Sequence, residues 1–158
     1  WMFLYLVRHG EALDEAADPG RPLSARGVQE VALAGKFLKD IDAKPRILLC
    51  SDKLRARQTA ERLLREMGLE TRIEPRKGLA PKDDPEPFAE ELGQVSEDVL
   101  IAGHSPFLPK LACFLLCGRQ DPETFPMATG GIIRLEREGR GAWKLSLSIS
   151  PEEFIEVI

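Results

Sequence analysis

The sequence predicts an α/β fold in which helices cover both faces of a mostly parallel sheet. Short apolar runs, of the length of buried strands, alternate with amphipathic helical segments along most of the chain. This alternation is typical of a three-layer α/β/α sandwich. The length of 158 residues is enough for one well-buried core and too short for two ordinary domains. We therefore expect a single domain over residues 1–158.

The first strand, loop and helix are predicted from the first 40 residues. Met2 to Val7 is an apolar run that indicates a buried strand. Residues 11–22 are polar and predict a loop. Ser24 is a good N-cap because its hydroxyl can accept a hydrogen bond from the first helical turn, and apolar residues recur behind it at helical spacing. We expect this helix to run to about Asp40.

The second and third strands enclose a second helix. Residues 46–50 are apolar from Ile47 onward and predict a buried strand. Residues 53–67 predict a helix that ends at Gly68, since glycine adopts the left-handed conformation that commonly follows a helix. Residues 71–74 predict a short third strand, and the proline-rich segment 76–87 predicts an irregular loop.

The rest of the chain continues the alternation of strands and helices. Apolar runs and turn signals predict two more helices and three more strands. In chain order we expect a helix at 88–92, a strand at 99–102, a helix at 107–116, and strands at 132–137 and 143–149.

Composition and charge argue against several classes of partner. The net charge of -4 and the pI near 5.3 disfavour nonspecific nucleic-acid binding, which needs excess positive charge. The apolar stretches are too short to span a bilayer, and the apolar start is shorter than a signal-peptide core and lacks a basic leader. Cys50, Cys113 and Cys117 are odd in number and suit reduced thiols packed in a core. We expect a soluble, cytoplasmic protein without a disulfide and without a membrane or nucleic-acid partner.

Three of the predicted buried strands end in distinctive polar segments. These segments are Arg8-His9-Gly10, residues 51–59, and Gly103-His104-Ser105-Pro106. If the strands run parallel, their carboxyl ends lie on one edge of the sheet, where open α/β sheets bind ligands. Both histidines of the chain would then share one pocket.

The residue types in these segments suit phosphoryl transfer. An arginine fork such as that of Arg8 matches phosphate oxygens, and the neutral imidazole of His9 can attack phosphorus. Arg55 is predicted in the first turn of its helix, where the free backbone N–H groups also favour an anion. Arg57 is interpreted as a solvated surface residue. A cysteine-dependent phosphatase is excluded because Ala56 stands where that chemistry needs an arginine, six positions after Cys50.

These segments resemble the histidine phosphatase superfamily. The resemblance rests on Arg8-His9-Gly10-Glu11, on Arg55-Ala56-x-Gln58-Thr59, and on Gly103-His104. The loop containing Leu13-Asp14, Asp18, Arg21-Pro22-Leu23-Ser24 and Gly27 further resembles the SixA-type phosphohistidine phosphatases, a short branch without a cap domain. The resemblance implies a phosphoglycerate mutase-like fold with a mixed, mainly parallel six-stranded sheet.

The resemblance also implies a role for each site residue. His9 would be the nucleophile that is transiently phosphorylated. Arg8, Arg55 and His104 would form the phosphate pocket, and Arg21 would complete it in this branch. The expected site needs no cofactor, and two histidines already assigned to it leave too few ligands for a metal site.

A proton-donating acid is the part of the site that the sequence does not define. Superfamily members that act on phosphate esters generally use a carboxylic acid from the region corresponding to residues 79–84. Asp83 and Asp84 lie there, and Glu11 follows the first motif, but none reproduces the usual acid motif. A phosphohistidine can leave as a neutral imidazole, so a strong acid is less necessary for a P–N bond than for a P–O bond.

We therefore hypothesise a monomeric phosphatase that removes phosphate from phosphohistidine in a signalling or phosphocarrier protein through a phosphohistidine intermediate. Two alternatives remain open from the sequence. One is a general phosphomonoesterase that uses Glu11 or Asp83 as an acid. The other is a catalytically idle module that binds phosphorylated proteins.

Overall fold

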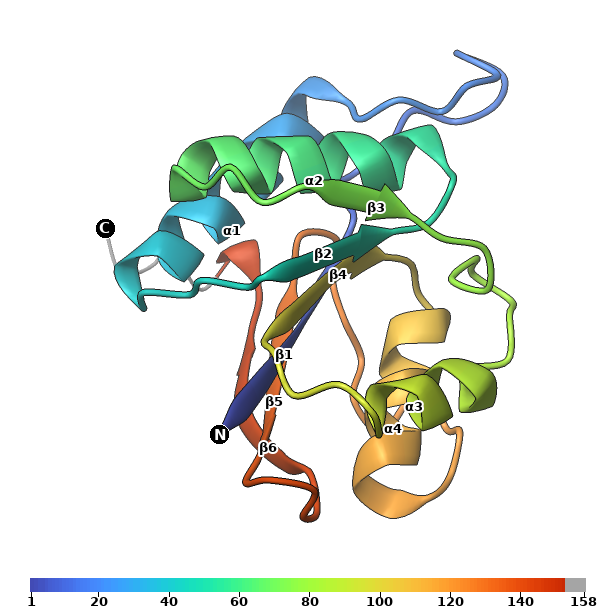
Figure 1. Ribbon diagram of the computed structural model, residues 1–158. Helices are drawn as coiled ribbons and strands as arrows, with labels where there is room; N and C mark the ends of the chain where they lie inside the picture. The colour runs from blue at the N-terminus through green and yellow to red at the C-terminus, as the bar shows by residue number, and fades with distance from the viewer. Residues whose placement is uncertain (153–158) are drawn as a thin grey trace.

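The computed structural model describes residues 1–152 and shows helices on both sides of a central six-stranded sheet (Figure 1). The elements in chain order are β1 (Met2–Arg8), α1 (Ala25–Asp40), β2 (Ile47–Cys50), α2 (Leu54–Met67), β3 (Ile73–Pro75), α3 (Glu86–Leu92), β4 (Val99–Gly103), α4 (Phe107–Cys117), β5 (Ile132–Arg137) and β6 (Lys144–Ile149). This confirms the predicted three-layer α/β/α architecture.

The strand order in the sheet is β3-β2-β4-β1-β5-β6. β1, β2, β3 and β4 are mutually parallel, whereas β5 pairs antiparallel with both β1 and β6. The sheet is therefore mixed and mainly parallel, as expected. After β1 the chain moves toward β2 and β3, and after β4 it moves the other way, toward β5. The connections thus diverge between the neighbouring strands β1 and β4, which is where doubly wound sheets open a crevice for a ligand.

Side chains of the sheet divide the core into two apolar clusters, one on each face. In β1, Leu4 and Leu6 pack with α3 and α4, whereas Tyr5 and Val7 pack with α1 and α2. β4 repeats this alternation, because successive side chains of a strand point to opposite faces. Figure 1 shows α1 and α2 together on one side of the sheet and α3 and α4 on the other. The central strands are therefore covered on both faces, and their carboxyl ends are held in fixed positions.

The ends of the first two helices agree with the sequence prediction. The Ser24 side chain accepts a hydrogen bond from the backbone N–H of Gly27 at 3.0 Å, as an N-cap should. Gly68 ends α2 in the left-handed conformation with φ of 68°. Strands β1 and β4 each extend one residue further than predicted, to Arg8 and Gly103.

Three predictions from the sequence need correction. β3 begins at Ile73 rather than residue 71 and includes Pro75, which is tolerated because β3 is an edge strand. α3 begins at Glu86 rather than residue 88, because Pro87 in the first turn needs no backbone N–H and has a helical φ. Cys117, expected in the core, is exposed at the last residue of α4. All three cysteines have free thiols.

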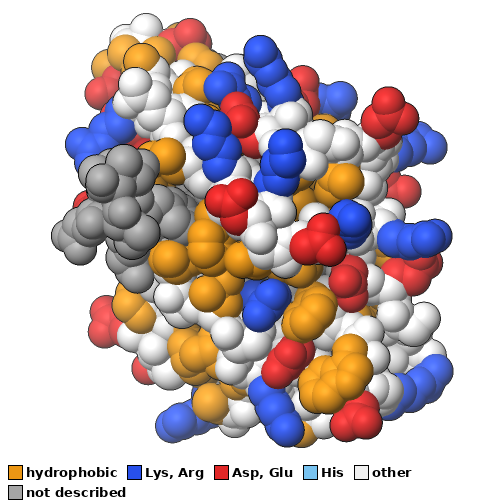
Figure 2. All heavy atoms as spheres, turned by 90° about the vertical axis from the view of Figure 1, so that its left-hand side faces the viewer, with side chains coloured by type: hydrophobic (Ala, Val, Ile, Leu, Met, Phe, Trp, Pro, Cys, Tyr) orange, Lys and Arg blue, Asp and Glu red, His pale blue; other side chains and the backbone are white. Residues whose placement is uncertain are grey.

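The face turned away from α3 and α4 carries a mixture of charged and apolar side chains. Figure 2 shows orange apolar side chains gathered in the middle and lower parts of this face, with charged groups around them, and shows no imidazole there. Both histidines are buried elsewhere. In the part of the chain that the structure describes, no helix combines the length and apolar character that crossing a bilayer requires.

Candidate active site

The parallel pairing of β1 and β4 brings the two histidines of the chain together. Arg8 lies opposite Gly103 in the register of these strands, and the backbone N–H of His9 donates to the Gly103 carbonyl at 2.8 Å. His9 and His104 therefore leave neighbouring strands at the same edge. Their ring centroids are 5.1 Å apart in an edge-on arrangement with an interplanar angle of 63°. The two histidines therefore lie side by side, as the topology predicted.

A backbone carbonyl fixes the proton of the His9 ring. The Nδ1 atom of His9 lies 2.6 Å from the carbonyl oxygen of Gly10. Because a carbonyl can only accept a hydrogen bond, Nδ1 carries the proton in this contact. Burial first, and then the charges of Arg55, Arg8 and Arg21, lower the pKa of His9 to about 4, against the opposing effect of the Gly10 bond. The ring is therefore neutral at pH 7, and Nε2 holds the free lone pair of a nucleophile.

A side chain at the end of β2 contacts the His104 ring. Its Nε2 lies 2.6 Å from the Ser51 hydroxyl, and both residues are 1% exposed. Its Nδ1 is buried and has no hydrogen-bond partner within residues 1–152. Burial lowers the pKa of His104 to about 3, and the nearby His9, Arg55, Lys53 and Arg8 act in the same direction. This imidazole is also neutral at pH 7.

Arg8 and Arg55 reach the site from a strand and from a helix. Arg8 ends β1, and its Nη1 donates to the Met127 carbonyl at 2.7 Å. Arg55 lies in the first turn of α2. In each residue Nε is buried and lacks a hydrogen-bond partner among the described residues. Burial lowers the pKa of both guanidinium groups, but arginine stays protonated at neutral pH. Two half-buried cations, each with a buried Nε that has no partner in the described residues, therefore act on His9.

Arg21 approaches the same group of residues from the loop between β1 and α1. Its backbone adopts a positive φ of 48°, and its Nε donates to the Leu13 carbonyl at 3.0 Å. Its charge lowers the pKa of both His9 and Arg55. Arg21 thus acts electrostatically on the site, while its Nε is used within the loop.

Residues of α2 hold the two flanking loops in place. The Thr59 hydroxyl accepts a hydrogen bond from the Gly10 backbone N–H at 3.2 Å and donates to the Arg55 carbonyl at 2.8 Å. The Gln58 side chain accepts from the backbone N–H of Leu23 at 2.8 Å. Both side chains lie one helical turn after Arg55. That spacing was visible in the sequence, but no role followed from it there.

The chain after His9 passes very close to the start of α1, and two glycines permit this. A Cβ on Gly27 would lie 2.0 Å from the Glu11 carbonyl oxygen, and one on Gly10 would lie 2.4 Å from the Gly27 carbonyl oxygen. Neither contact could exist with a larger residue. The glycines of both motifs therefore fix how the His9 loop rests on α1.

The three carboxylates considered as acids are engaged with other groups. Glu11 accepts a hydrogen bond from the Ser24 hydroxyl at 3.0 Å and lies 3.9 Å from the Arg26 guanidinium. Asp83 accepts from the Ala80 backbone N–H, and Asp84 accepts from the Glu86 backbone N–H and the Gln120 side chain. Each of the three therefore accepts a hydrogen bond from another group of the protein.

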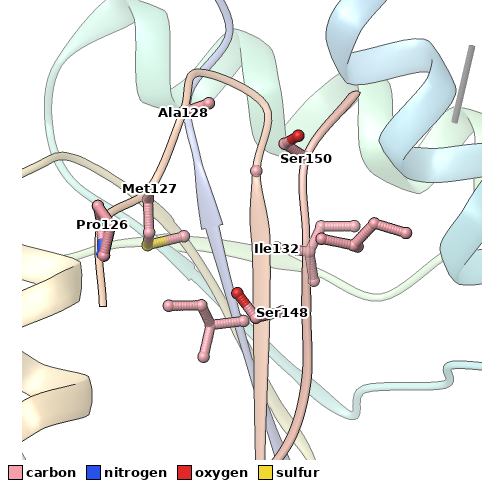
Figure 3. A pocket seen from close by; sticks show the side chains of 9 residues that line it. Pro126, Met127, Ala128, Ile132, Ser148 and Ser150 are labelled. Carbon is pink, nitrogen blue, oxygen red and sulfur yellow. The ribbon is translucent and has the colours of Figure 1, made fainter. Parts of the chain in front are cut away.

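A hollow of about 400 Å³ with a mixed polar and apolar lining lies next to the start of β5. Pro126 and Met127 form one side of it, and Ile132 and Ser150 lie across from them (Figure 3). Two lining residues also contact Arg8: the Met127 carbonyl accepts from its side chain and the Gly131 carbonyl from its backbone N–H. Within the described residues no group of three or more His, Cys, Asp or Glu side chains is placed to hold a metal ion.

Ser51 and the Met127 carbonyl were not identified as site groups from the sequence. Ser51 stands at the end of β2, so its position at the same edge was a usable signal. The Met127 carbonyl gives no such signal, because a backbone acceptor does not depend on residue type. Arg57, in contrast, is a surface residue paired with Glu61 at 3.5 Å, as expected.

Comparison with known proteins agrees with this geometry. Residues 4–79 match the model of the histidine phosphatase superfamily (branch 1). The chain is 29% identical over 152 residues to phosphohistidine phosphatase SixA of Escherichia coli (strain K12), covering 93% of this chain and 94% of the relative. It is 32% identical over 162 residues to an uncharacterized protein of Picosynechococcus sp. (strain ATCC 27264 / PCC 7002 / PR-6), covering 98% of this chain and 94% of that one.

A solved structure gives the same result at the level of the fold. The structure of the protein histidine phosphatase SixA complexed with tungstate superimposes with a TM-score of 0.84 at 30% identity, covering 96% of this chain and 99% of that chain. The sequence motifs, the mixed sheet and these relatives agree. The chain belongs to the histidine phosphatase superfamily.

Proposed function

We propose that this protein removes phosphate from phosphohistidine in a protein substrate, through a phosphoryl intermediate on His9. One observation carries the proposal. Three buried nitrogen atoms, the Nε of Arg8, the Nε of Arg55 and the Nδ1 of His104, have no hydrogen-bond partner in residues 1–152, and His9 beside them is bound at its Nδ1 by Gly10. Buried donors are normally satisfied, so this cluster is built for an acceptor with several oxygens.

The phosphoryl group of a bound substrate has the complementary chemistry. Its oxygens accept from the two guanidinium groups and from His104, while phosphorus faces the Nε2 lone pair of His9. The relative solved with tungstate, a tetrahedral oxyanion like phosphate, supports an anion of this shape. The charge on the oxygens in the transition state strengthens these bonds, which is how such a site lowers the barrier.

Two displacements complete the reaction. In the first, the His9 Nε2 lone pair forms a bond to phosphorus and the substrate P–N bond breaks, so the substrate histidine leaves as a neutral imidazole when its other nitrogen carries a proton. In the second, water attacks phosphorus and the His9–phosphorus bond breaks. The Nδ1 proton that His9 shares with Gly10 stays in place throughout, so His9 also leaves as a neutral imidazole. One proton of the attacking water stays on the new P–OH group, and the other goes to a phosphate oxygen or to solvent.

A P–N bond suits this site better than a P–O bond. An alkoxide leaving group needs an acid, whereas Glu11, Asp83 and Asp84 are each engaged as acceptors. The name of the Escherichia coli relative points to the same substrate class. Two exposed leucines beside the site, Leu13 and Leu54, support a protein as the carrier of the phosphohistidine, because they offer apolar contact next to the arginines.

The test is a comparison of two substrates. The protein is incubated with a histidine-phosphorylated protein and, separately, with a phosphate monoester, and inorganic phosphate release is measured. We expect release from phosphohistidine at least tenfold faster at equal concentration. Faster release from the ester would show a general phosphomonoesterase. Binding of the phosphoprotein without any release would show an idle binding module.

A further inference from the structure

The Ser51 hydroxyl occupies a place that the reaction above leaves without a role. It is buried at the end of β2 and contacts His104 rather than the reacting nucleophile. Its neighbours at hydrogen-bond distance among the described residues are the His104 Nε2 at 2.6 Å and the Lys53 backbone N–H at 3.3 Å. Ser51 therefore links the start of α2 to the second imidazole of the site.

The partners of this hydroxyl decide which way its hydrogen bond runs. The Lys53 N–H can only donate, so Ser51 Oγ accepts from it. The hydroxyl proton then needs an acceptor, and among residues 1–152 the acceptor within reach is the His104 Nε2. A buried hydroxyl proton without an acceptor would be costly. Ser51 therefore donates and Nε2 accepts.

The hydrogen bond from Ser51 to Nε2 of His104 determines the protonation of Nδ1 in the same ring. A neutral imidazole has one proton, so a ring that accepts at Nε2 carries its proton at Nδ1. Nδ1 is the buried atom that lacks a partner within the described part of the chain. As an N–H group it donates to a phosphoryl oxygen. In the other tautomer it would present a lone pair to that oxygen and repel it.

We propose that Ser51 is a positioning residue that fixes His104 as the Nδ1–H tautomer, so that this ring serves as a neutral hydrogen-bond donor to the transferred phosphoryl group. This inference rests on the proposed function for its kinetic consequence. Its structural part, the location of the proton, stands independently and is measured without any substrate.

The first test measures the tautomer directly. Nitrogen-15 NMR of the imidazoles distinguishes a protonated ring nitrogen from a bare one, and the two histidines are assigned with His9→Gln and His104→Gln. We expect wild-type His104 to carry its proton on Nδ1, and Ser51→Ala to show both tautomers. A wild-type proton on Nε2, or the same tautomer in both proteins, would overturn the inference.

The second test measures the reaction, with phosphoramidate as a small P–N substrate. We expect Ser51→Ala to lower kcat about tenfold, in the range found for groups that orient a histidine, with a smaller change in KM. Ser51→Thr keeps the hydroxyl and should restore most of the activity. Ser148→Ala, on β6, is the control and should match the wild type. Circular dichroism checks that each variant is folded.

The outcomes separate the two proposals. A wild type that is inert toward both phosphoramidate and phosphohistidine contradicts the proposed function, while the NMR result still judges Ser51. An active wild type with a fully active Ser51→Ala contradicts the role of Ser51 alone. If Ser51→Ala does not fold, the same tautomer and kcat measurements are made on Ser51→Thr. This variant keeps a hydroxyl, so His104 should keep its proton on Nδ1. A proton on Nε2 of His104 in this variant would overturn the inference.

Discussion

The ends of β1 and β4 present the same residue type, at the same edge of the sheet, for two different tasks. His9 follows β1 and is held at Nδ1 by the Gly10 carbonyl, which leaves Nε2 as a lone pair. His104 follows β4 and is held at Nε2 by the Ser51 hydroxyl, which leaves Nδ1 as the free atom. Both rings are buried and neutral. In the proposed reaction, the ring atom that a neighbour binds, rather than the residue type, makes one histidine the nucleophile and the other the donor.

The largest expected effect is the loss of the nucleophile. His9→Ala should abolish turnover of phosphohistidine, by at least about 10⁴-fold, because no other group can form the bond to phosphorus. Activity is measured as phosphate release from a histidine-phosphorylated protein. Residual activity within a hundredfold of the wild type would mean that water or another group attacks the substrate directly.

Removing one donor should cost less than removing the nucleophile. His104→Ala, Arg8→Ala and Arg55→Ala should each lower kcat by about 10² to 10³-fold, because each deletes a bond that strengthens in the transition state. His104→Ala should still form a phosphoenzyme, unlike His9→Ala. The matched control for Arg55→Ala is Arg57→Ala, since Arg57 lies half a turn away on the same helix but is exposed and paired with Glu61. Equal losses in both arginine variants would contradict the proposed pocket.

The stability of the protein should depend on pH through the two imidazoles. Both folded-state pKa values, about 4 for His9 and about 3 for His104, lie below the usual value of 6.5. Between pH 6.5 and 4 the unfolded chain therefore binds more protons, so the free energy of unfolding should fall as the pH falls, and should be insensitive to these groups above pH 7. Both imidazoles should stay neutral to below pH 5 in an NMR titration.

The same titration tests the charge that acts on both rings. Arg55→Gln should raise the pKa of His9 and of His104 toward the usual value, because the charge of Arg55 lowers both. Arg57→Gln serves as the control and should leave both values in place. Midpoints near 6.5 in the wild type would show that the rings are solvated, which would contradict the buried site.

The smallest expected effect concerns the protein substrate. Leu54 precedes Arg55 and is 44% exposed, and Leu145 on β6 has the same exposed fraction away from the histidines. Leu54→Ser should raise KM for a histidine-phosphorylated protein severalfold and leave phosphoramidate turnover unchanged, since only the protein substrate is large enough to contact Leu54. Leu145→Ser should alter neither. Equal effects of the two variants on both substrates would argue against a protein contact at Leu54.

Much of the fold could be predicted from the sequence, because it is determined by local patterns. Apolar runs located the buried strands β1, β2 and β4, and Ser24 and Gly68 marked helix ends through their own chemistry. The errors fell where tertiary context decides. Pro75 is accepted in β3 only because that strand is at an edge, and Pro87 lies inside α3 because the first turn needs no N–H at that position.

The histidines and Arg8 of the candidate site were predictable, and the groups that hold them were less so. Arg8 ends β1, and His9 and His104 follow β1 and β4, whose parallel pairing brings these residues together, so topology alone placed them. The proton positions depend on contacts between segments far apart in the chain, such as Ser51 with His104, or on a backbone carbonyl such as that of Gly10. A pattern of side-chain types carries little information about where a backbone carbonyl lies or about which ring nitrogen of a histidine it binds.

The most direct measurement is the position of phosphate on the trapped phosphoenzyme. The protein is reacted briefly with a phosphoryl donor, quenched in alkali, digested and examined by mass spectrometry and phosphorus NMR. The account predicts a single modified residue, His9, phosphorylated at Nε2, because Gly10 holds the proton on Nδ1. Phosphate on His104, on the Nδ1 of His9, or on neither ring during turnover would contradict it.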